Sequence, residues 1–179
     1  MSKKHYIITS VTLGAIAAVS AGVIGLTNLI TKGSIAKNEK ARIQKGISEI
    51  FGENAEIVSE FAIKDNNYSY LVYGYEIKND ESGLDKYAIR TSGYNTYGKV
   101  SLLVGVSESE SYEFAFSRMS IISNEQSYAA TLEDEYIDLV NEGRIDVEDV
   151  TCGATYGATL VRNMINSTVE YANTALRNG

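Results

Sequence analysis

The chain has 179 residues, the length of one domain, and carries 16 Lys and Arg against 23 Asp and Glu, for a formal net charge of −7. The first 46 residues hold seven basic residues and one acidic residue, so they carry +6, and the remaining 133 residues carry −13. An acidic body of this size repels phosphate backbones, so nucleic acid is not expected as a partner.

Two residue types that carry much of protein chemistry are nearly absent. The single cysteine, Cys152, excludes a disulfide framework within the chain and a structural zinc cluster, so no metal site is expected. The single histidine, His5, lies near the start of the chain, which excludes Ser-His-Asp and Cys-His catalysis in the body. Tyrosine is frequent, with 13 residues against 4 Phe, so the aromatic surface can also form hydrogen bonds.

An uncharged stretch of 26 residues runs from Tyr6 to Thr31. As a helix it would be about 39 Å long, enough to cross a hydrocarbon core of about 30 Å. Gly14, Ala18, Gly22 and Gly25 form a strip of small residues that would let another membrane helix approach closely. The sequence therefore predicts a single-pass membrane anchor over residues 1–31.

A cleaved signal peptide is the alternative for the same stretch. Lys3 and Lys4 would form its basic region, and Val19-Ser20-Ala21 resembles a cleavage site with small residues. The apolar run continues past that point through Leu29-Ile30, which favours an uncleaved anchor. Because basic residues also follow the stretch, charge alone would place the body in the cytoplasm.

The next segment, residues 32–52, is predicted to be an amphipathic helix beside the membrane. Its apolar residues recur at roughly helical spacing with charged residues between them, namely Ile35, Ile43, Ile47, Ile50 and Phe51. Its basic face could contact anionic lipid headgroups or water, and the sequence leaves both open.

Residues 53–179 are predicted to form one α+β domain with a mainly antiparallel sheet covered by two helices. Segments of strand character, separated by turn residues, are expected at residues 57–63, 68–77, 87–91, 100–106 and 112–122. Helical periodicity returns at residues 128–141 and 154–176. No linker divides this body.

The start of the last helix is the segment that carries chemistry. Gly153, Ala154 and Thr155 have small side chains, so a cluster of backbone N–H groups without intrahelical partners is accessible there. Such a terminus attracts anions, above all phosphate. The alternative is that Thr155 is an ordinary N-cap residue. A P-loop is excluded because no Gly-Lys-Ser/Thr follows.

The segment from Asp149 to Thr155 reads DVTCGAT. It resembles the flavinylation motif of the FMN-binding domain in the G subunit of Rnf electron-transport complexes and the C subunit of the Na+-translocating NADH:quinone reductase. In that family an Asp, two variable residues and a Ser or Thr precede Gly-Ala-Thr, and the final Thr carries FMN through a phosphoester bond. Weaker similarities occur in order along the chain, at Thr31 to Ala36 with Glu39, at Gly93-Tyr94 and at Tyr136 to Val140.

The resemblance implies a role for each motif residue. Thr155 would carry the FMN, Gly153 and Ala154 would give its phosphate access to the backbone, and Asp149 would be recognised by the flavin transferase. Cys152 stands where the family has Ser or Thr, and its thiol is a weaker hydrogen-bond donor. A second Gly-Ala-Thr ends at Thr159, but no Asp lies six residues before it, so Thr155 is the predicted site.

The family also has a Glu-Thr-Pro-Gly loop that contributes to the flavin pocket. Here the corresponding stretch is Asn124 to Tyr128, which contains Glu125 but no Pro or Gly. Tyr94 or Tyr128 is expected to stack on the isoalloxazine ring in a more exposed pocket.

The expected function is that of a membrane-anchored flavoprotein electron carrier, a subunit of an oxidoreductase complex rather than a free-standing enzyme. The resemblance implies other membrane subunits of an Rnf- or Nqr-type complex as partners, a flavin transferase for maturation, and a cell-membrane location with the FMN domain on the extracytoplasmic side. Two alternatives remain: a stand-alone anchored FMN domain that transfers electrons outside the cytoplasm, and a non-redox, membrane-tethered binding or sensor module.

Overall fold

The structure is a computed structural model that describes residues 13–14, 17, 20, 38–78 and 83–177. Most of the predicted membrane anchor, Tyr6 to Thr31, therefore lies outside the described residues. Within the described part, no helix has both the length and the apolar character that a membrane crossing requires. The chain divides into two units, Met1–Arg42 and Ile43–Gly179, and the second contains the sheet and the helices that pack on it.

Five strands form one sheet in sequence order, and every neighbouring pair is antiparallel. The strands are β1 (Ile57–Ala62), β2 (Leu71–Ile77), β3 (Lys86–Asn95), β4 (Gly98–Glu108) and β5 (Phe114–Asn124). This meander confirms the predicted antiparallel sheet and the α+β class. All five strands fall where the sequence pattern placed them, but β3 and β4 extend well beyond the predicted residues 87–91 and 100–106.

The extra length of β3 and β4 forms a long hairpin that ends in a two-residue turn. Its last pair is Asn95 opposite Gly98, and the Asn95 Oδ1 accepts a hydrogen bond of 2.8 Å from the Tyr97 N–H. Gly98 has φ of +135°, and a Cβ there would overlap the backbone carbonyl of Glu125. Glycine at this position therefore lets the hairpin tip pack directly against the loop that follows β5.

Among the described residues from 38 onward, three helical regions accompany the sheet. Residues 38–51 are helical. After β5 come α2 (Ala129–Leu132), the π-helical η1 (Glu133–Ile137) and α3 (Asp138–Asn141), which follow one another without a break. The last region is α4 (Thr155–Tyr171) followed by the π-helical η2 (Ala172–Leu176). The helices predicted at residues 128–141 and 154–176 are confirmed.

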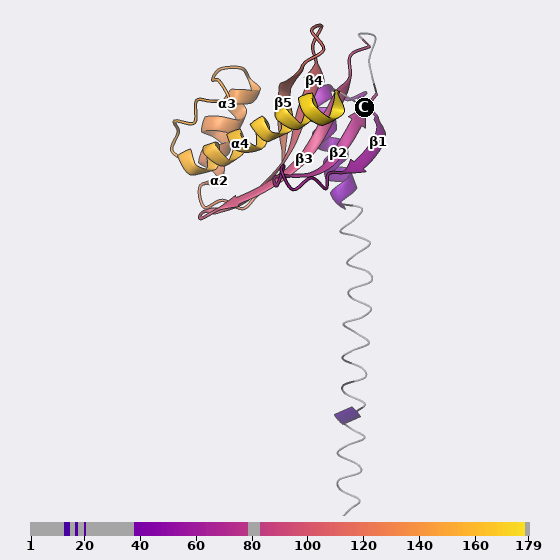
Figure 1. Cartoon of the computed structure of the whole chain (residues 1–179). Coiled ribbons are helices and arrows are strands. Elements are labelled where there is room, and N and C mark those ends of the chain that lie inside the picture. Colours follow the sequence, from indigo (N-terminus) through magenta and orange to yellow (C-terminus); the bar gives the residue numbers. More distant parts are fainter. Residues whose placement is uncertain (1–12, 15–16, 18–19, 21–37, 79–82, 178–179) are drawn as a thin grey trace, which may run out of the picture. The chain divides into compact units, whose positions relative to one another are not determined.

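Helices cover both faces of the sheet. Along β4, Leu102 and Val104 belong to the core formed with α4, whereas Leu103 belongs to a second core formed with Ile43 and Ile47. Because successive strand residues point to opposite faces, α4 and residues 43–51 lie on opposite sides. Figure 1 shows α4 crossing one face of the sheet, with α2 and α3 beside the half of α4 that holds its N-terminus.

The apolar side of the predicted amphipathic helix is thus buried against the sheet. Ile47 is fully buried, and Ile43 is 4% exposed. The Ser120 hydroxyl on β5 donates a hydrogen bond of 2.6 Å to the Glu49 carboxylate, which holds the pKa of Glu49 below its ordinary value. Residues 43–51 therefore form part of the same compact unit as the sheet, rather than a connector separate from it.

This packing predicts the effect of a methyl group at Gly105. A Cβ there would overlap the Ile50 Cγ2 and lie 3.1 Å from the Phe51 ring, so Gly105→Ala should lower the free energy of unfolding by about 1–3 kcal/mol. In an Ile50→Ala background the same substitution should cost clearly less, because the overlapping methyl is gone. Urea denaturation of the wild type, the two single variants and the double variant measures both costs. Equal costs of Gly105→Ala in the wild-type and Ile50→Ala backgrounds would contradict the packing of this helix on β4.

Candidate functional site

Thr155 is the first residue of α4, and the residue before it is the N-cap. Ala154 has φ of −115° and ψ of 42°, with no side-chain capping bond, and its carbonyl accepts the hydrogen bond of 3.0 Å from the Ala158 N–H. The interpretation of Thr155 as an N-cap is therefore wrong by one residue. The reason is that Ala154 already leaves the helical conformation, so Thr155 presents its side chain from the first turn itself.

Thr155 lies at the surface, and its hydroxyl has a defined hydrogen-bond partner. Thr155 is exposed, and its Oγ1 donates a hydrogen bond of 2.7 Å to the Cys152 carbonyl. This bond uses the hydroxyl proton and leaves the lone pairs of the oxygen free to accept. In contrast, Thr159 is half-buried, and its hydroxyl donates to the Thr155 carbonyl at 2.8 Å. The geometry therefore makes Thr155 the more accessible of the two Gly-Ala-Thr hydroxyls.

A carboxylate already contacts the backbone in front of α4. The Gly153 N–H donates a hydrogen bond of 2.8 Å to Glu135 Oε2, and a Cβ on Gly153 would lie 2.9 Å from the Thr131 Cγ2. The motif thus packs closely against α2 and η1, and its N–H groups attract an anionic oxygen as expected for a helix start. A phosphate that used the Gly153 N–H would have to displace Glu135.

Two other motif residues, Cys152 and Asp149, differ in their exposure to solvent. Cys152 is a half-buried free cysteine whose side chain packs against the core on the α4 side of the sheet. Asp149 is exposed, and its Oδ1 accepts a hydrogen bond of 3.3 Å from the Thr151 N–H. This turn leaves the Asp149 side chain at the surface.

The segment before the motif is tied to the helices on either side of it. The hydroxyl of the buried Tyr136, on η1, donates a hydrogen bond to the Val147 carbonyl. Glu148 accepts a hydrogen bond of 2.7 Å from the Asn166 amide of α4 and lies 3.6 Å from the Arg162 guanidinium. Burial raises the pKa of Tyr136 well above its ordinary value of about 10, so the phenol is neutral at physiological pH.

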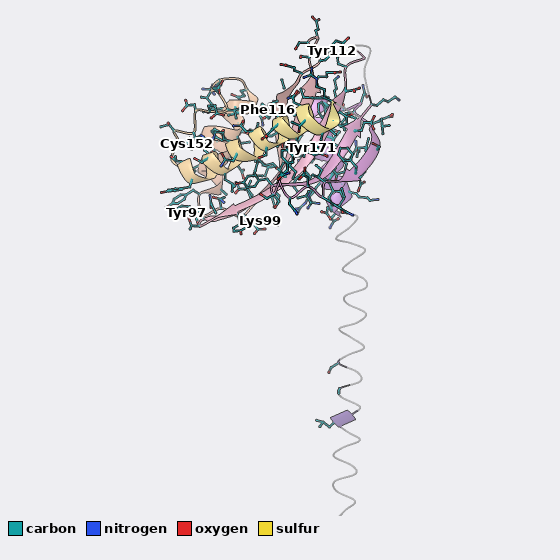
Figure 2. The ribbon with its side chains drawn as sticks, viewed as in Figure 1. Tyr97, Lys99, Tyr112, Phe116, Cys152 and Tyr171 are labelled. Carbon is teal, nitrogen blue, oxygen red and sulfur yellow. The ribbon has the colours of Figure 1, made fainter. Side chains whose placement is uncertain are left out.

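A cavity of about 270 Å³ opens beside Thr155. Three segments that are distant in sequence meet there: the tip of the β3–β4 hairpin, the loop after β5 and the start of α4. The residues that line it are Tyr97, Gln126, Tyr128, Gly153, Ala154, Thr155, Tyr156 and Gly157. Figure 2 shows Tyr97 and Cys152 at the same end of the body, far from Tyr112 at the β4–β5 turn.

Three tyrosines form an aromatic wall of this cavity. Tyr97 lies between the other two, with ring-centroid distances of 5.9 Å to Tyr128 and 5.5 Å to Tyr156. Tyr128 and Tyr156 are 56% and 69% exposed, so much of their ring surface is open to a ligand. Such rings can stack on a flat heteroaromatic group.

The structure brings together some of the residues that the sequence singled out, and separates others. Tyr128 lines the cavity with Gly153, Ala154 and Thr155. Tyr94 is 83% exposed and is not among the lining residues. Glu125 is also exposed and outside the lining, and it contributes through its backbone, where its N–H donates to the Lys99 carbonyl at 2.8 Å.

Sequence reasoning missed four lining residues, Tyr97, Gln126, Tyr156 and Gly157. Tyr97 occupies the turn of the β3–β4 hairpin, and its place beside Asn95 and Gly98 was the available signal for a hairpin tip. Tyr156 directly follows Thr155, and its exposure depends on where α4 begins. Gln126 lies in the loop predicted to contribute to the pocket, but nothing in its residue type distinguished it from its neighbours.

These features fit an FMN phosphoester in part. The hydroxyl is exposed, the helix start favours a phosphate, and tyrosine rings stand beside it. The volume of this cavity lies slightly below the range of about 300–1,000 Å³ that is typical of sites that enclose small ligands. The site would therefore cover a portion of a flavin and leave the rest in contact with water.

Comparison with protein families adds one match. Residues 1–50 match the family described as the RnfG N-terminal region, which agrees with the predicted resemblance to the RnfG-type FMN-binding family. The site around Thr155 lies outside the matched residues. Neither the search of curated proteins nor the search of solved structures gave a match.

The contact between Tyr136 and Val147 predicts a stability effect with a distinct pH dependence. Tyr136→Phe removes one hydrogen bond, so it should lower the free energy of unfolding at neutral pH by about 1 kcal/mol. The pKa of Tyr136 is raised in the folded protein, so above a pH of about 10 the unfolded chain binds fewer protons than the folded chain. The free energy of unfolding therefore falls as the pH rises further.

The substitution should make this alkaline loss shallower. Tyr87 and Tyr171, whose pKa values burial also raises, supply the remaining slope in both proteins. Urea denaturation between neutral pH and pH above 10 measures the difference, and identical alkaline slopes would contradict the account.

Proposed function

We propose that this chain is the G-type subunit of an Rnf-like membrane electron-transport complex and carries FMN covalently on Thr155. The match of residues 1–50 to the RnfG N-terminal region supports the assignment to such a complex. The single observation that carries the flavin proposal is the exposed Thr155 hydroxyl, which ends the DVTCGAT motif beside a tyrosine-lined cavity.

Each part of the site would have a simple task in this function. The Thr155 oxygen would hold the phosphate, and the unpaired N–H groups of the first turn of α4 would stabilise its charge. Tyr97, Tyr128 and Tyr156 would contact the ring and exclude water from one side of it. FMN itself would supply the redox chemistry, and the protein would supply its position and the local field.

Attachment requires an activated phosphate, which a flavin dinucleotide contains in its pyrophosphate. The Thr155 Oγ would form the ester bond to the flavin-side phosphorus, and a nucleoside monophosphate would be the leaving group as the pyrophosphate P–O bond is broken. The hydroxyl proton is released as the ester forms. A flavin transferase would catalyse this step and read the exposed Asp149 at the surface of the motif.

The predicted anchor, Tyr6 to Thr31, would attach this domain to the cell membrane and pack against other subunits through its small residues. We place the FMN domain on the extracytoplasmic side, where a covalent bond prevents loss of a cofactor that could not be recovered. Electrons would then pass between this domain and neighbouring membrane subunits.

This proposal predicts where the flavin is attached. After co-expression with a flavin transferase, the denatured wild-type chain should be fluorescent in a gel and heavier by FMN less one water. Thr155→Ala should lose both signals, and Thr155→Ser should retain them because it keeps the hydroxyl.

Thr159→Ala is the matched control, since it removes the neighbouring Gly-Ala-Thr hydroxyl and should leave the flavin in place. A dark wild-type band with the mass of the bare chain would instead favour the non-redox binding module. Purification of the flavin-bearing chain without any other membrane subunit would favour the stand-alone carrier.

A further inference from the structure

Gln126 is the centre of a polar network at the floor of the cavity. It is 8% exposed, and its amide nitrogen donates hydrogen bonds of 2.6 Å to the Gly98 carbonyl and 3.1 Å to the Asn95 Oδ1. These bonds join the loop after β5 to the β3–β4 hairpin tip. The Asn95 amide nitrogen in turn donates to the Tyr156 carbonyl at 3.1 Å, which extends the network to α4.

The chemistry of the partners fixes the orientation of both amides. The Gly98 and Tyr156 carbonyls can only accept, so each must receive an N–H. The Asn95 Oδ1 also accepts the Tyr97 N–H at 2.8 Å, which confirms that this atom is the oxygen. Gln126 therefore presents its nitrogen to the hairpin and its carbonyl oxygen to the opposite side.

That oxygen lies beside the first turn of α4. Gln126 and Gly157 both line the cavity, and a Cβ on Gly157 would lie 3.4 Å from the Gln126 Oε1. Gly157 follows Thr155 by two residues, which is about 3 Å along the helix axis but about 200° around it, so the two residues lie on opposite sides of α4. Gln126 and Thr155 nevertheless line the same cavity, so the Gln126 amide and the hydroxyl that the proposed function modifies both border the space that a bound flavin would enter.

We propose that the Gln126 Oε1 accepts a hydrogen bond from a hydroxyl of the ribityl chain of the bound flavin, and so positions that flavin in the cavity. The inference rests on the proposed attachment of FMN to Thr155. Beside the phosphate, the ligand is a polyol chain whose hydroxyls are donors, whereas the ring with its imide N–H lies at the far end of that chain. Gln126 is a binding and positioning residue, and it takes no part in forming the ester.

Replacement of Gln126 by Met tests this role, because Met has a similar length and neither donates nor accepts strongly. Intact mass gives the covalent flavin content of the wild-type and Gln126→Met proteins, and the flavin-bearing fractions are compared. The fast, local component in the fluorescence anisotropy decay of the folded holoprotein should at least double in amplitude, because the chain of the flavin loses its anchor. Gln44→Met makes the same chemical change at an exposed position on the other face of the sheet and should leave the decay unchanged.

Flavin analogues on the wild-type chain identify the donor and do not depend on how the variant folds. Flavin analogues that each lack one ribityl hydroxyl are supplied as dinucleotides. In the wild-type chain, the analogue that lacks the donor hydroxyl should show the same increased flavin mobility as FMN in the Gln126→Met protein. In the Gln126→Met protein, this analogue should cause no further increase in mobility. An analogue methylated at the ring imide should behave like FMN. Increased mobility with the methylated ring alone would overturn the inference.

The outcomes separate this inference from the proposed function. A wild-type chain that carries covalent flavin but shows the same decay in the Gln126→Met protein and with every deoxy analogue overturns the role of Gln126 alone. A wild-type chain that carries no flavin overturns both.

Discussion

The burial of one side of α4 on the sheet is the constraint that places the candidate site. Ala158, Val161, Met164 and Ile165 are fully buried in the core shared with β4. With 3.6 residues per turn, this register directs Thr155 and Tyr156 away from the core at the first turn. The exposure of the Thr155 hydroxyl is therefore a consequence of core packing. A change in the register of α4 would turn the hydroxyl toward α2 or the sheet.

A second constraint brings distant segments to that exposed turn. The β3–β4 hairpin extends to Gly98, whose positive φ and lack of a side chain let the tip contact the backbone of the loop after β5. The amides of Asn95 and Gln126 then connect the tip, the loop and α4 by side-chain hydrogen bonds. Tyr97 and Gln126 reach the cavity because of this arrangement, so the aromatic wall and the polar floor share one structural origin.

The periodicity of the sequence was sufficient to predict the sheet and the helices after it. The strand character of residues 100–106 and the steps of three or four along residues 154–176 reflect local geometry, and both predictions are confirmed. The ends of β3 and β4 were missed because Gly93, Asn95 and Gly98 interrupt the apolar pattern in the hairpin tip. Their conformations depend on contacts with residues about thirty to seventy positions further on, which a local pattern does not contain.

Local sequence patterns also do not contain the distant contacts that form the site and that pack the helix at residues 38–51. The motif located Thr155 in the sequence, and the loop from Asn124 to Tyr128 contributes Tyr128 and Gln126 to the cavity. The pairing of Tyr97 with Tyr156 joins residues that are far apart in the sequence, and nothing in either residue indicates it. For the helix, the isoleucine spacing predicts an apolar face, but a membrane surface and a sheet satisfy such a face equally. The burial of Ile47 identifies the sheet as its partner.

Peptide mapping is the most direct test of the proposed attachment of FMN to one hydroxyl of this domain. Trypsin cleaves after Arg144 and Arg162, so Thr151, Thr155 and Thr159 lie in the single peptide Ile145–Arg162. In protein matured with a flavin transferase, this peptide should be heavier by FMN less one water, and fragmentation should place the added mass on Thr155. An unmodified peptide, or a flavin located on Thr151 or Thr159, would contradict the account.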